Sequence, residues 1–410
     1  MAVSAFALFA NQADGLTDST SVGNAARCPV TWSAPVALRT ASGEWGYVHA
    51  PQLIESRRGL IMLGVSATTS VSSGDSTVSH DGISVGFALR GDESIAAPIP
   101  NPVLGHRVLW PRGRVATDGA LEVVWAEADD SSRHSWPIRR LRFARFDGSS
   151  WSTPVTLVEG SDLRWSSTSS LVQDGSDGLL LAVSDNSEMS QAVVVVRRSG
   201  DHWLSTRVPV GAASGYAAVQ PERGGTWVVT FVSASRGQRH DRNSLFVSIS
   251  RDRGASWSTP VKIHSGGRNG VFDPDLEMRS DSSLVLMWSQ DAEDNPDADS
   301  EVVSVLAGAG SALSRRSAVA APGGITPGDR ATSATSSVFG VLYTSRERSQ
   351  MQYLEWDGLQ WRRCAVPFQE PAFGLGLLLR RGRGVAAWSS ENRLGHGAVV
   401  LVTQVVRLRW

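Results

Sequence analysis

An eight-residue stretch near the middle of the chain recurs in imperfect copies at intervals of roughly fifty residues. Residues 250–257 read Ser-Arg-Asp-Arg-Gly-Ala-Ser-Trp and are followed by Ser-Thr-Pro-Val. The nearest copy is residues 146–155, Phe-Asp-Gly-Ser-Ser-Trp-Ser-Thr-Pro-Val, and weaker copies lie at Trp32, Trp203 and Trp361. An aspartate with a glycine beside it favours a tight turn, because glycine accepts a positive φ. Each copy therefore predicts a turn that leads into a strand starting near the tryptophan.

A second pattern divides the chain in the same way. A short apolar strand ends in a bulky residue and is followed by a small or hydroxyl residue; the bulky positions are Val65, Trp125, Val183, Phe231, Trp288, Tyr343 and Trp388. Each interval also holds an extended run before this strand and one or two after it, which is the four-strand content of a propeller blade. We therefore predict an all-β fold, a seven-bladed β-propeller of four-stranded blades that forms one domain over residues 28–410.

The two ends of the chain complement each other. Residues 399–403 form a third strand with no hairpin partner after it, and residues 32–38 form an outer strand with nothing before them. We predict that the N-terminal strand completes the last blade, which removes a free sheet edge. Cys28 and Cys364 then lie near neighbouring outer strands, and either a disulfide bond or two free buried thiols fits the sequence.

Charge and hydropathy exclude several classes of partner. The formal net charge is −1 and no basic stripe is present, so nucleic-acid binding is disfavoured. No apolar run is long enough to cross a bilayer. Residues 1–27 are expected to be an N-terminal arm or the remnant of a signal sequence, because residues 2–10 are small and apolar. We expect a secreted or cell-surface monomer whose partner is a saccharide or another small molecule.

Residues 250–257 resemble the Asp-box of the bacterial neuraminidase repeats, which occur in sialidase-like β-propellers. The stretch has Ser256 where the family usually has threonine. The resemblance implies a propeller directed at glycans, with the six blades of the sialidases as the alternative to seven. The family also includes other glycoside hydrolases, polysaccharide lyases and lectin-like binders. The sialidase set of site residues is absent, since the one Arg-Val-Pro, residues 207–209, falls in an expected outer strand.

Histidines cluster on the predicted channel face, where the loops between blades converge. Seven of the eight histidines map there, and only His202 maps to the face that carries the repeated turn. Histidine serves as acid, base or metal ligand near neutral pH. A lyase for acidic glycans would draw its base and acid from His49, His106, His134 and Tyr47, and would bind the substrate carboxylate through Arg107 and Arg133.

A glycoside hydrolase would instead need two carboxylates. Asp273 and Asp275 lie on an expected innermost strand, where their alternating spacing predicts that both point to the same side, and Glu127 is a third candidate. Each of these could equally be a structural aspartate or glutamate that accepts hydrogen bonds.

Further substrate contacts are expected from residues in the same loops. Aromatic rings stack on the apolar faces of sugars, or else pack between blades. The expected binding residues are Trp45, Trp110, Trp136, Trp165, Tyr216 and His240, and Arg330 is a further charged member of the loops. Residues 291–299 contain five carboxylates, which fits either a calcium site or a solvated acidic loop. No other cofactor is implied.

The sequence thus leaves three functions open. A polysaccharide lyase or glycoside hydrolase acting at the central channel is the first, a lectin-like glycan binder is the second, and a propeller that binds a protein or a non-sugar small molecule is the third.

Overall fold

We describe a computed structural model of the chain. It covers residues 28–407 except for 29, 38, 41–42, 45–47, 58, 73–74, 89–94, 97, 100–106, 129–137, 166–168, 170, 176–177, 188–190, 211–213, 234–242, 266–270, 279–282, 292–300, 310–314, 322–324, 336, 346–349, 369–371, 381–382 and 392–397. The predicted N-terminal arm, residues 1–27, lies outside the described residues. Within them the fold is all-β, and the helical segment is a single 3-10 turn, η1 (Arg223–Gly225).

Most of the strands form antiparallel sheets in which strands adjacent in sequence pair with each other. The first sheet has the order β5-β6-β7-β9, with bounds β5 (Val48–Ser56), β6 (Gly59–Ser72), β7 (Asp75–Ala88) and β9 (Pro98–Ile99). A small sheet beside it has the order β4-β3-β8 and contains β3 (Arg39–Thr40), β4 (Gly43–Glu44) and β8 (Ile95–Ala96). In this small sheet β3 and β8 run parallel.

An eight-stranded sheet follows, and it consists of two four-stranded groups. The first group is β10 (Arg107–Val115), β11 (Leu121–Ala128), β12 (Ile138–Phe146) and β13 (Val155–Arg164). The second is β14 (Leu171–Asp174), β15 (Gly178–Asp185), β16 (Ala192–Ser199) and β17 (His202–Pro209). The two groups join where the end of β13 pairs with the end of β15, Leu163 with Asp185 and Arg164 with Ser184.

Three four-stranded sheets then repeat one topology in chain order. They are β18 (Ser214–Pro221), β19 (Trp227–Ser233), β20 (Ser244–Ser250) and β21 (Val261–Ser265); β22 (Phe272–Met278), β23 (Ser283–Asp291), β24 (Glu301–Ala309) and β25 (Arg315–Ala321); and β26 (Ile325–Ala334), β27 (Phe339–Ser345), β28 (Met351–Trp356) and β29 (Trp361–Ala365). The last sheet holds β30 (Ala372–Arg380), β31 (Arg383–Glu391) and β32 (Ala398–Arg407) together with β1 (Val30–Trp32) and β2 (Val36–Ala37).

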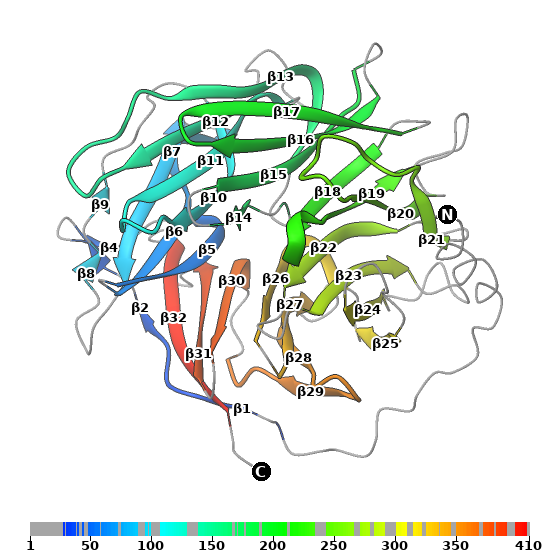
Figure 1. The fold of residues 1–410 in the computed structure, drawn as a ribbon. Helices are drawn as coiled ribbons and strands as arrows, with labels where there is room; N and C mark the ends of the chain where they lie inside the picture. The colour runs from blue at the N-terminus through cyan, green and yellow to red at the C-terminus, as the bar shows by residue number, and fades with distance from the viewer. Residues whose placement is uncertain are drawn as a thin grey trace.

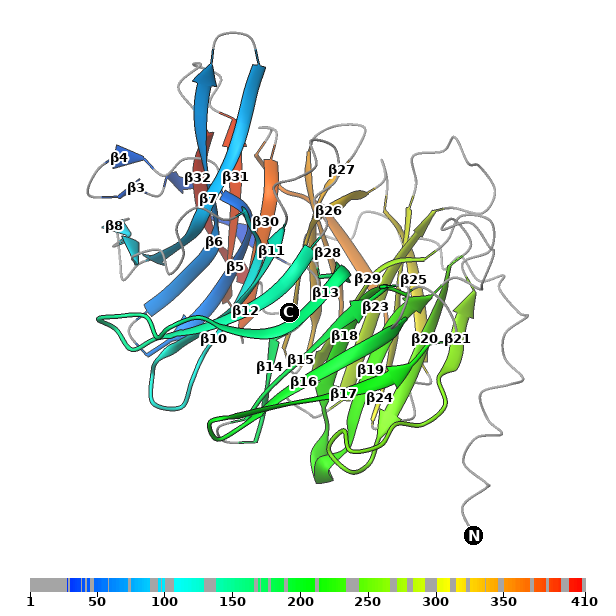
Figure 2. The same cartoon turned by 90° about the horizontal axis from the view of Figure 1, so that it is seen from above.

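The sheets stand around a common centre, with one strand of each four-stranded group nearest to it (Figure 1). In the part of the chain that the structure describes, β5, β10, β14, β18, β22, β26 and β30 contact one another in that order, and β30 contacts β5. The turned view shows the sheets stacked face to face (Figure 2). Within the described residues these inner strands therefore contact one another in a cycle, the ring of inner strands.

Three of the strands that lie next to an inner strand are buried on both faces. All residues of β11, β19 and β27 are buried, because neighbouring sheets pack against both sides of them. Among the repeated bulky residues, Trp125, Trp288 and Trp388 are at most 1% exposed. Hydrophobic clusters join adjacent sheets; for example, one cluster combines residues of β18 and β19 with residues of β22 and β23.

The repeated turn has the geometry that the sequence predicts. It connects β20 to β21, and Asp252 accepts hydrogen bonds there from the Ser256 amide (2.9 Å) and from the Ser256 and Ser250 hydroxyls (2.6 and 2.8 Å). Gly254 has a φ of 81°. The corresponding turns before β13 and β29 contain Gly148 (φ 105°) and Gly358 (φ 93°). Asp147 and Asp357 also accept hydrogen bonds from backbone amides within their turns, so each of the three turns is organised by hydrogen bonds to its own aspartate.

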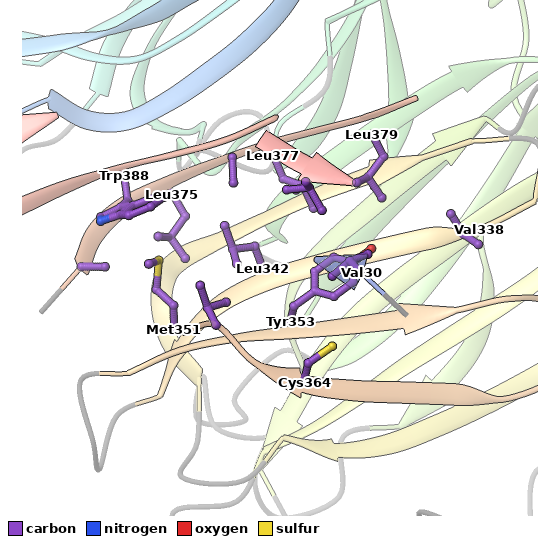
Figure 3. Close-up of a cluster of buried hydrophobic side chains, with 14 residues drawn as sticks. Val30, Val338, Leu342, Met351, Tyr353, Cys364, Leu375, Leu377, Leu379 and Trp388 are labelled. Atoms are coloured by element: carbon purple, nitrogen blue, oxygen red, sulfur yellow. The ribbon is translucent and has the colours of Figure 1, made fainter. Parts of the chain in front are cut away.

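The two ends of the described chain meet in the last sheet. Val30 pairs with Arg407 and Trp32 with Val405, and the Thr403 hydroxyl donates to the Ser33 carbonyl (2.7 Å). A disulfide bond joins Cys28 to Cys364, whose Cα atoms are 5.3 Å apart. Of the two alternatives that the sequence left open, the disulfide is the one present. Figure 3 shows Val30, Tyr353 and Cys364 gathered in the cluster between the last two sheets.

Reduction of this disulfide is expected to destabilise the protein by about 2–5 kcal/mol, because the bond closes a long loop of the unfolded chain. The measurement is the melting temperature with and without reductant. A Cys28→Ser/Cys364→Ser variant is the control: its melting temperature should be close to that of the reduced wild-type protein and should not change when reductant is added. Equal melting temperatures for oxidised and reduced wild type would contradict the prediction.

Gly254→Ala is expected to destabilise the fold by about 2 kcal/mol or more. The new Cβ collides with the ring of buried Trp227, and the alanine backbone must also adopt a positive φ. Gly200→Ala is the matched control. Gly200 also has a positive φ, 60°, but open space surrounds the position of its Cβ, so the expected cost is about 1 kcal/mol. Chemical denaturation of both variants checks this difference, and equal losses would show that Trp227 plays no part.

Candidate functional site

A polar cavity of about 250 Å³ lies at the centre of the ring. All seven inner strands or the residues next to them contribute to its wall: Pro51, Gln52, Leu53, Arg112, Ser169, Leu171, Val172, Gln220, Asp275, Glu277, Arg330, Ala331, Thr332, Leu375, Gly376 and Leu377. The cavity is therefore a product of ring closure, since no single sheet builds more than a small part of it.

The inner strands share an irregularity that turns side chains toward this cavity. The pairing register shifts once near the start of β5, β10, β18, β22, β26 and β30. In three of these bulges a proline directly precedes the first polar residue of the wall: the pairs are Pro51-Gln52, Pro111-Arg112 and Pro274-Asp275. Proline has no N–H to donate, so it fits where the ladder is interrupted.

Two carboxylates occupy one side of the cavity. Asp275 and Glu277 alternate along β22, so both point to the same face of the strand, and both line the wall. Asp275 is 6% exposed, and its Oδ2 accepts a hydrogen bond from the Thr332 hydroxyl of β26. Burial raises the pKa of Asp275, while the Thr332 hydrogen bond and the charges of Arg330 and Arg112 oppose that rise. Burial and the charge of Asp275 together raise the pKa of Glu277 well above its usual range.

Two buried arginines balance these acids. Arg112 of β10 and Arg330 of β26 are 7% and 4% exposed, and both line the cavity. Burial lowers the pKa of Arg112 to about 10, although the charge of Asp275 acts in the opposite direction. Arg112 therefore remains a cation at neutral pH, and the site contains two cations facing at most two anions.

Uncharged side chains connect neighbouring inner strands. Gln52 of β5 donates to the Gly113 carbonyl (3.2 Å) and accepts from the Gly113 amide (2.7 Å). Gln220 of β18 donates to the Leu276 carbonyl of β22 (2.7 Å). These hydrogen bonds link β5 to β10 and β18 to β22, which belong to neighbouring sheets.

The structure places one predicted catalytic residue, Asp275, in this cavity. The expectation that Asp273 and Asp275 share a face assumed regular alternation, but the bulge between Phe272 and Asp275 interrupts it. The side chain of Asp273 lies outside the described residues. Glu127 is not part of the wall: its carboxylate accepts from Trp125 Nε1 (3.3 Å) and lies 3.8 Å from Arg142.

The described aromatic candidates lie away from the cavity wall. Trp165 is fully buried, and its Nε1 donates to the Trp110 carbonyl (2.9 Å), so the expectation that its ring is exposed to a sugar is wrong. Trp110 is half-buried in the β10 bulge with a φ of 43°, and Tyr216 is half-buried in β18. Trp165 does not recur in the repeat, but a residue without a repeat partner can still belong to the core.

The remaining predicted site residues fall where the structure gives no side chain. Only the backbone is described for His49 in β5 and Arg107 in β10. Those entirely outside the described residues are Tyr47, Trp45, His106, Arg133, His134, Trp136 and His240. Of the seven clustered histidines, His264 has a described side chain; it is buried, with its ring centroid 5.2 Å from that of Trp288. The histidine hypothesis therefore stays a prediction.

Sequence reasoning missed Arg112 and Glu277, and it placed Arg330 in a loop rather than on β26. Pro51-Gln52 and Pro111-Arg112 repeat the proline-polar pattern of Pro274-Asp275. This recurring pattern is the sequence feature from which Arg112 could have been predicted. Glu277 follows from its position two residues after Asp275.

No group of three or more potential metal ligands occurs in the described part of the chain. The acidic stretch considered for calcium, apart from Asp291, lies outside it. In the described part of the chain, no helix is long and apolar enough to span a membrane.

No protein-family model and no curated protein sequence matches the chain. Solved structures do share its fold. A protein of unknown function from Dyadobacter fermentans has a TM-score of 0.53 at 10% identity, covering 93% of this chain and 100% of that one. A PL25 polysaccharide lyase, an ulvan lyase bound to -[GlcA(1-4)Rha3S]-, has a TM-score of 0.53 at 9% identity, covering 90% and 95%.

A sialidase from Trypanosoma rangeli, in complex with the inhibitor DANA, has a TM-score of 0.50 at 9% identity, and the match covers 92% of this chain and 60% of that one. The lyase and the sialidase are β-propellers. The likeness establishes the fold: an all-β arrangement of antiparallel sheets, similar to that of β-propeller enzymes. The resemblance to sialidase-like propellers is thus supported at the level of architecture.

Glu277→Gln is expected to change how stability depends on pH. A carboxyl whose pKa is raised by folding binds its proton more tightly in the folded state, so the free energy of unfolding falls as pH rises through that pKa. The variant should melt like the wild type below about pH 4.5 and about 1–3 °C higher above the raised pKa. Glu159→Gln, on an exposed side chain of β13, is the control and should follow the wild-type curve. If the melting temperatures of Glu277→Gln and the wild type depended on pH in the same way, folding would not raise the pKa of Glu277, and the prediction would be wrong.

Proposed function

We propose that the chain is a seven-bladed β-propeller and that its central cavity cleaves an acidic glycan by β-elimination. Seven inner strands in a closed cycle support the blade count, and the N-terminal strand paired with β32 supports closure of the last blade. One observation carries the proposed reaction: a single cavity holds two buried arginines and, on one wall, two carboxyl groups of raised pKa.

Each group has a part in the elimination. Arg112 and Arg330 neutralise the carboxylate of a uronate, which makes the proton on the adjacent carbon removable. Asp275, as the carboxylate, takes that proton; a double bond forms to the next carbon as its bond to the glycosidic oxygen breaks. Glu277, as the neutral acid, gives its proton to the leaving oxygen.

The positions of the acids favour elimination over hydrolysis. Canonical glycoside hydrolases place two carboxyl groups on either side of the scissile bond. Asp275 and Glu277 instead lie on the same strand and the same wall, and the described lining has no acidic residue opposite them. A base and an acid on one side fit the removal of a proton and a leaving oxygen from one face of the sugar.

The similarity of the fold to that of a polysaccharide lyase supports this proposal. An ulvan lyase bound to a glucuronate-containing saccharide shares the fold over 90% of this chain. We also propose that the protein is a monomer that works in an oxidising, extracytoplasmic compartment, where a disulfide such as Cys28–Cys364 persists.

The test is a screen of the purified protein against uronate-containing and neutral polysaccharides, following the ultraviolet absorbance of unsaturated uronate together with reducing ends. We expect both signals to rise on a uronate-containing polymer. Asp275→Asn and Glu277→Gln should each lower kcat/KM by at least about 10²-fold, because each removes a proton-transfer group. Glu159→Gln is the control, since Glu159 pairs with Arg140 on the exposed side of β13.

Three results would overturn the proposal. Reducing ends without absorbance would indicate hydrolysis. Binding without any product would indicate the lectin-like alternative. Full activity in both cavity variants would place the chemistry elsewhere, among the histidine-bearing loops predicted from the sequence.

A further inference from the structure

The two carboxyl groups in the cavity have unequal surroundings. Asp275 receives the Thr332 hydrogen bond and faces the charges of Arg330 on β26 and Arg112 on β10. The charged group that acts on Glu277 is Asp275, which disfavours its ionisation. Two neighbouring acids in unequal environments divide their protons unequally, and that division sets which one serves as acid and which as base.

Thr332 has a defined position relative to Asp275. Arg330 and Thr332 alternate along β26, so both face the cavity, and both line its wall. The inner strands β22 and β26 contact each other directly. Across that contact the Thr332 hydroxyl donates a hydrogen bond to Asp275 Oδ2. This hydrogen bond is strongest when the Asp275 carboxyl is ionised.

We propose that Thr332 is the positioning residue that keeps Asp275 ionised and leaves the proton of the pair on Glu277. Asp275 is then ready to accept a proton, and Glu277 is ready to donate one. The proposal deepens the proposed function, on which the assigned chemical roles rest. The distribution of the proton itself is a property of the free protein.

The direct test is a pH titration of the side-chain carboxyl carbons by NMR in protein labelled selectively at aspartate and glutamate. In Thr332→Val the titration of Asp275 should move upward by about one pH unit, because a hydrogen bond to the charged form is lost. Thr332→Ser keeps the hydroxyl and should restore the wild-type curve. Thr230→Val is the matched control: Thr230 is a fully buried threonine of β19 whose hydroxyl bonds to the Phe246 carbonyl.

A second measurement uses the reaction. If Asp275 is the base, the acidic limb of the pH profile of kcat/KM should move upward by the same amount in Thr332→Val and return in Thr332→Ser. A threonine that only packs would lower activity at every pH without moving the limb. An unmoved limb in an active enzyme would overturn the positioning role.

The two measurements separate the two proposals. An upward NMR shift in a protein that cleaves no glycan would support the proton assignment and refute the proposed reaction. Identical Asp275 titrations in wild type and Thr332→Val would overturn the inference even in an active lyase. Failure of Thr332→Ser to restore the wild-type curve would overturn it too, since the shift would then come from altered packing.

Discussion

The mutual neutralisation of buried charges at the centre is the interaction on which the cavity depends. A single ion moved into a protein interior costs several kcal/mol, as an order of magnitude, and opposite charges nearby offset that cost. Asp275 of β22 and Arg330 of β26 come from neighbouring inner strands, and Arg112 is brought to them from β10, which is not a neighbour of either strand. The packing of the sheets and the electrostatics of the cavity therefore depend on each other. The apolar faces bring the inner strands together, and the opposite charges offset the cost of burying ions where those strands meet.

The bulges explain how inner strands can serve both purposes. A regular strand would alternate its side chains between its two neighbouring sheets, and this alternation suits packing. The register shift near the start of six inner strands redirects the next residue, and the wall of the cavity collects Gln52, Arg112, Asp275, Arg330 and Leu375 in this way. The same irregularity recurs with different side chains, so the repeat provides a fixed backbone whose chemistry varies from sheet to sheet.

The features that the sequence predicts well are local or repeated. The turn around Asp252 and the buried Trp125, Trp288 and Trp388 follow from short motifs and from their period. Which strands meet around the cavity has no such local pattern, and this is why Arg112 of β10 was missed. Glu277 was missed although it lies on the same strand as Asp275, two residues further on. Trp165 shows the opposite error, because absence from the repeat says nothing about burial. Asp275 was found since its strand could be placed innermost by counting strands within the repeat.

The paired strands β1 and β32 lie at opposite ends of the described chain, so they are synthesised far apart in time. A chain emerging from the ribosome has residues 28–37 long before their partners at 398–407 exist. Until then the first strand has no ladder, while the intermediate sheets can already pair within themselves. Contacts of such large sequence separation form late. Synthesis of β32 is thus the event that lets the two ends of the described chain pair in the last sheet, so a chain truncated before β32 would expose unpaired strand edges on both β1 and β31.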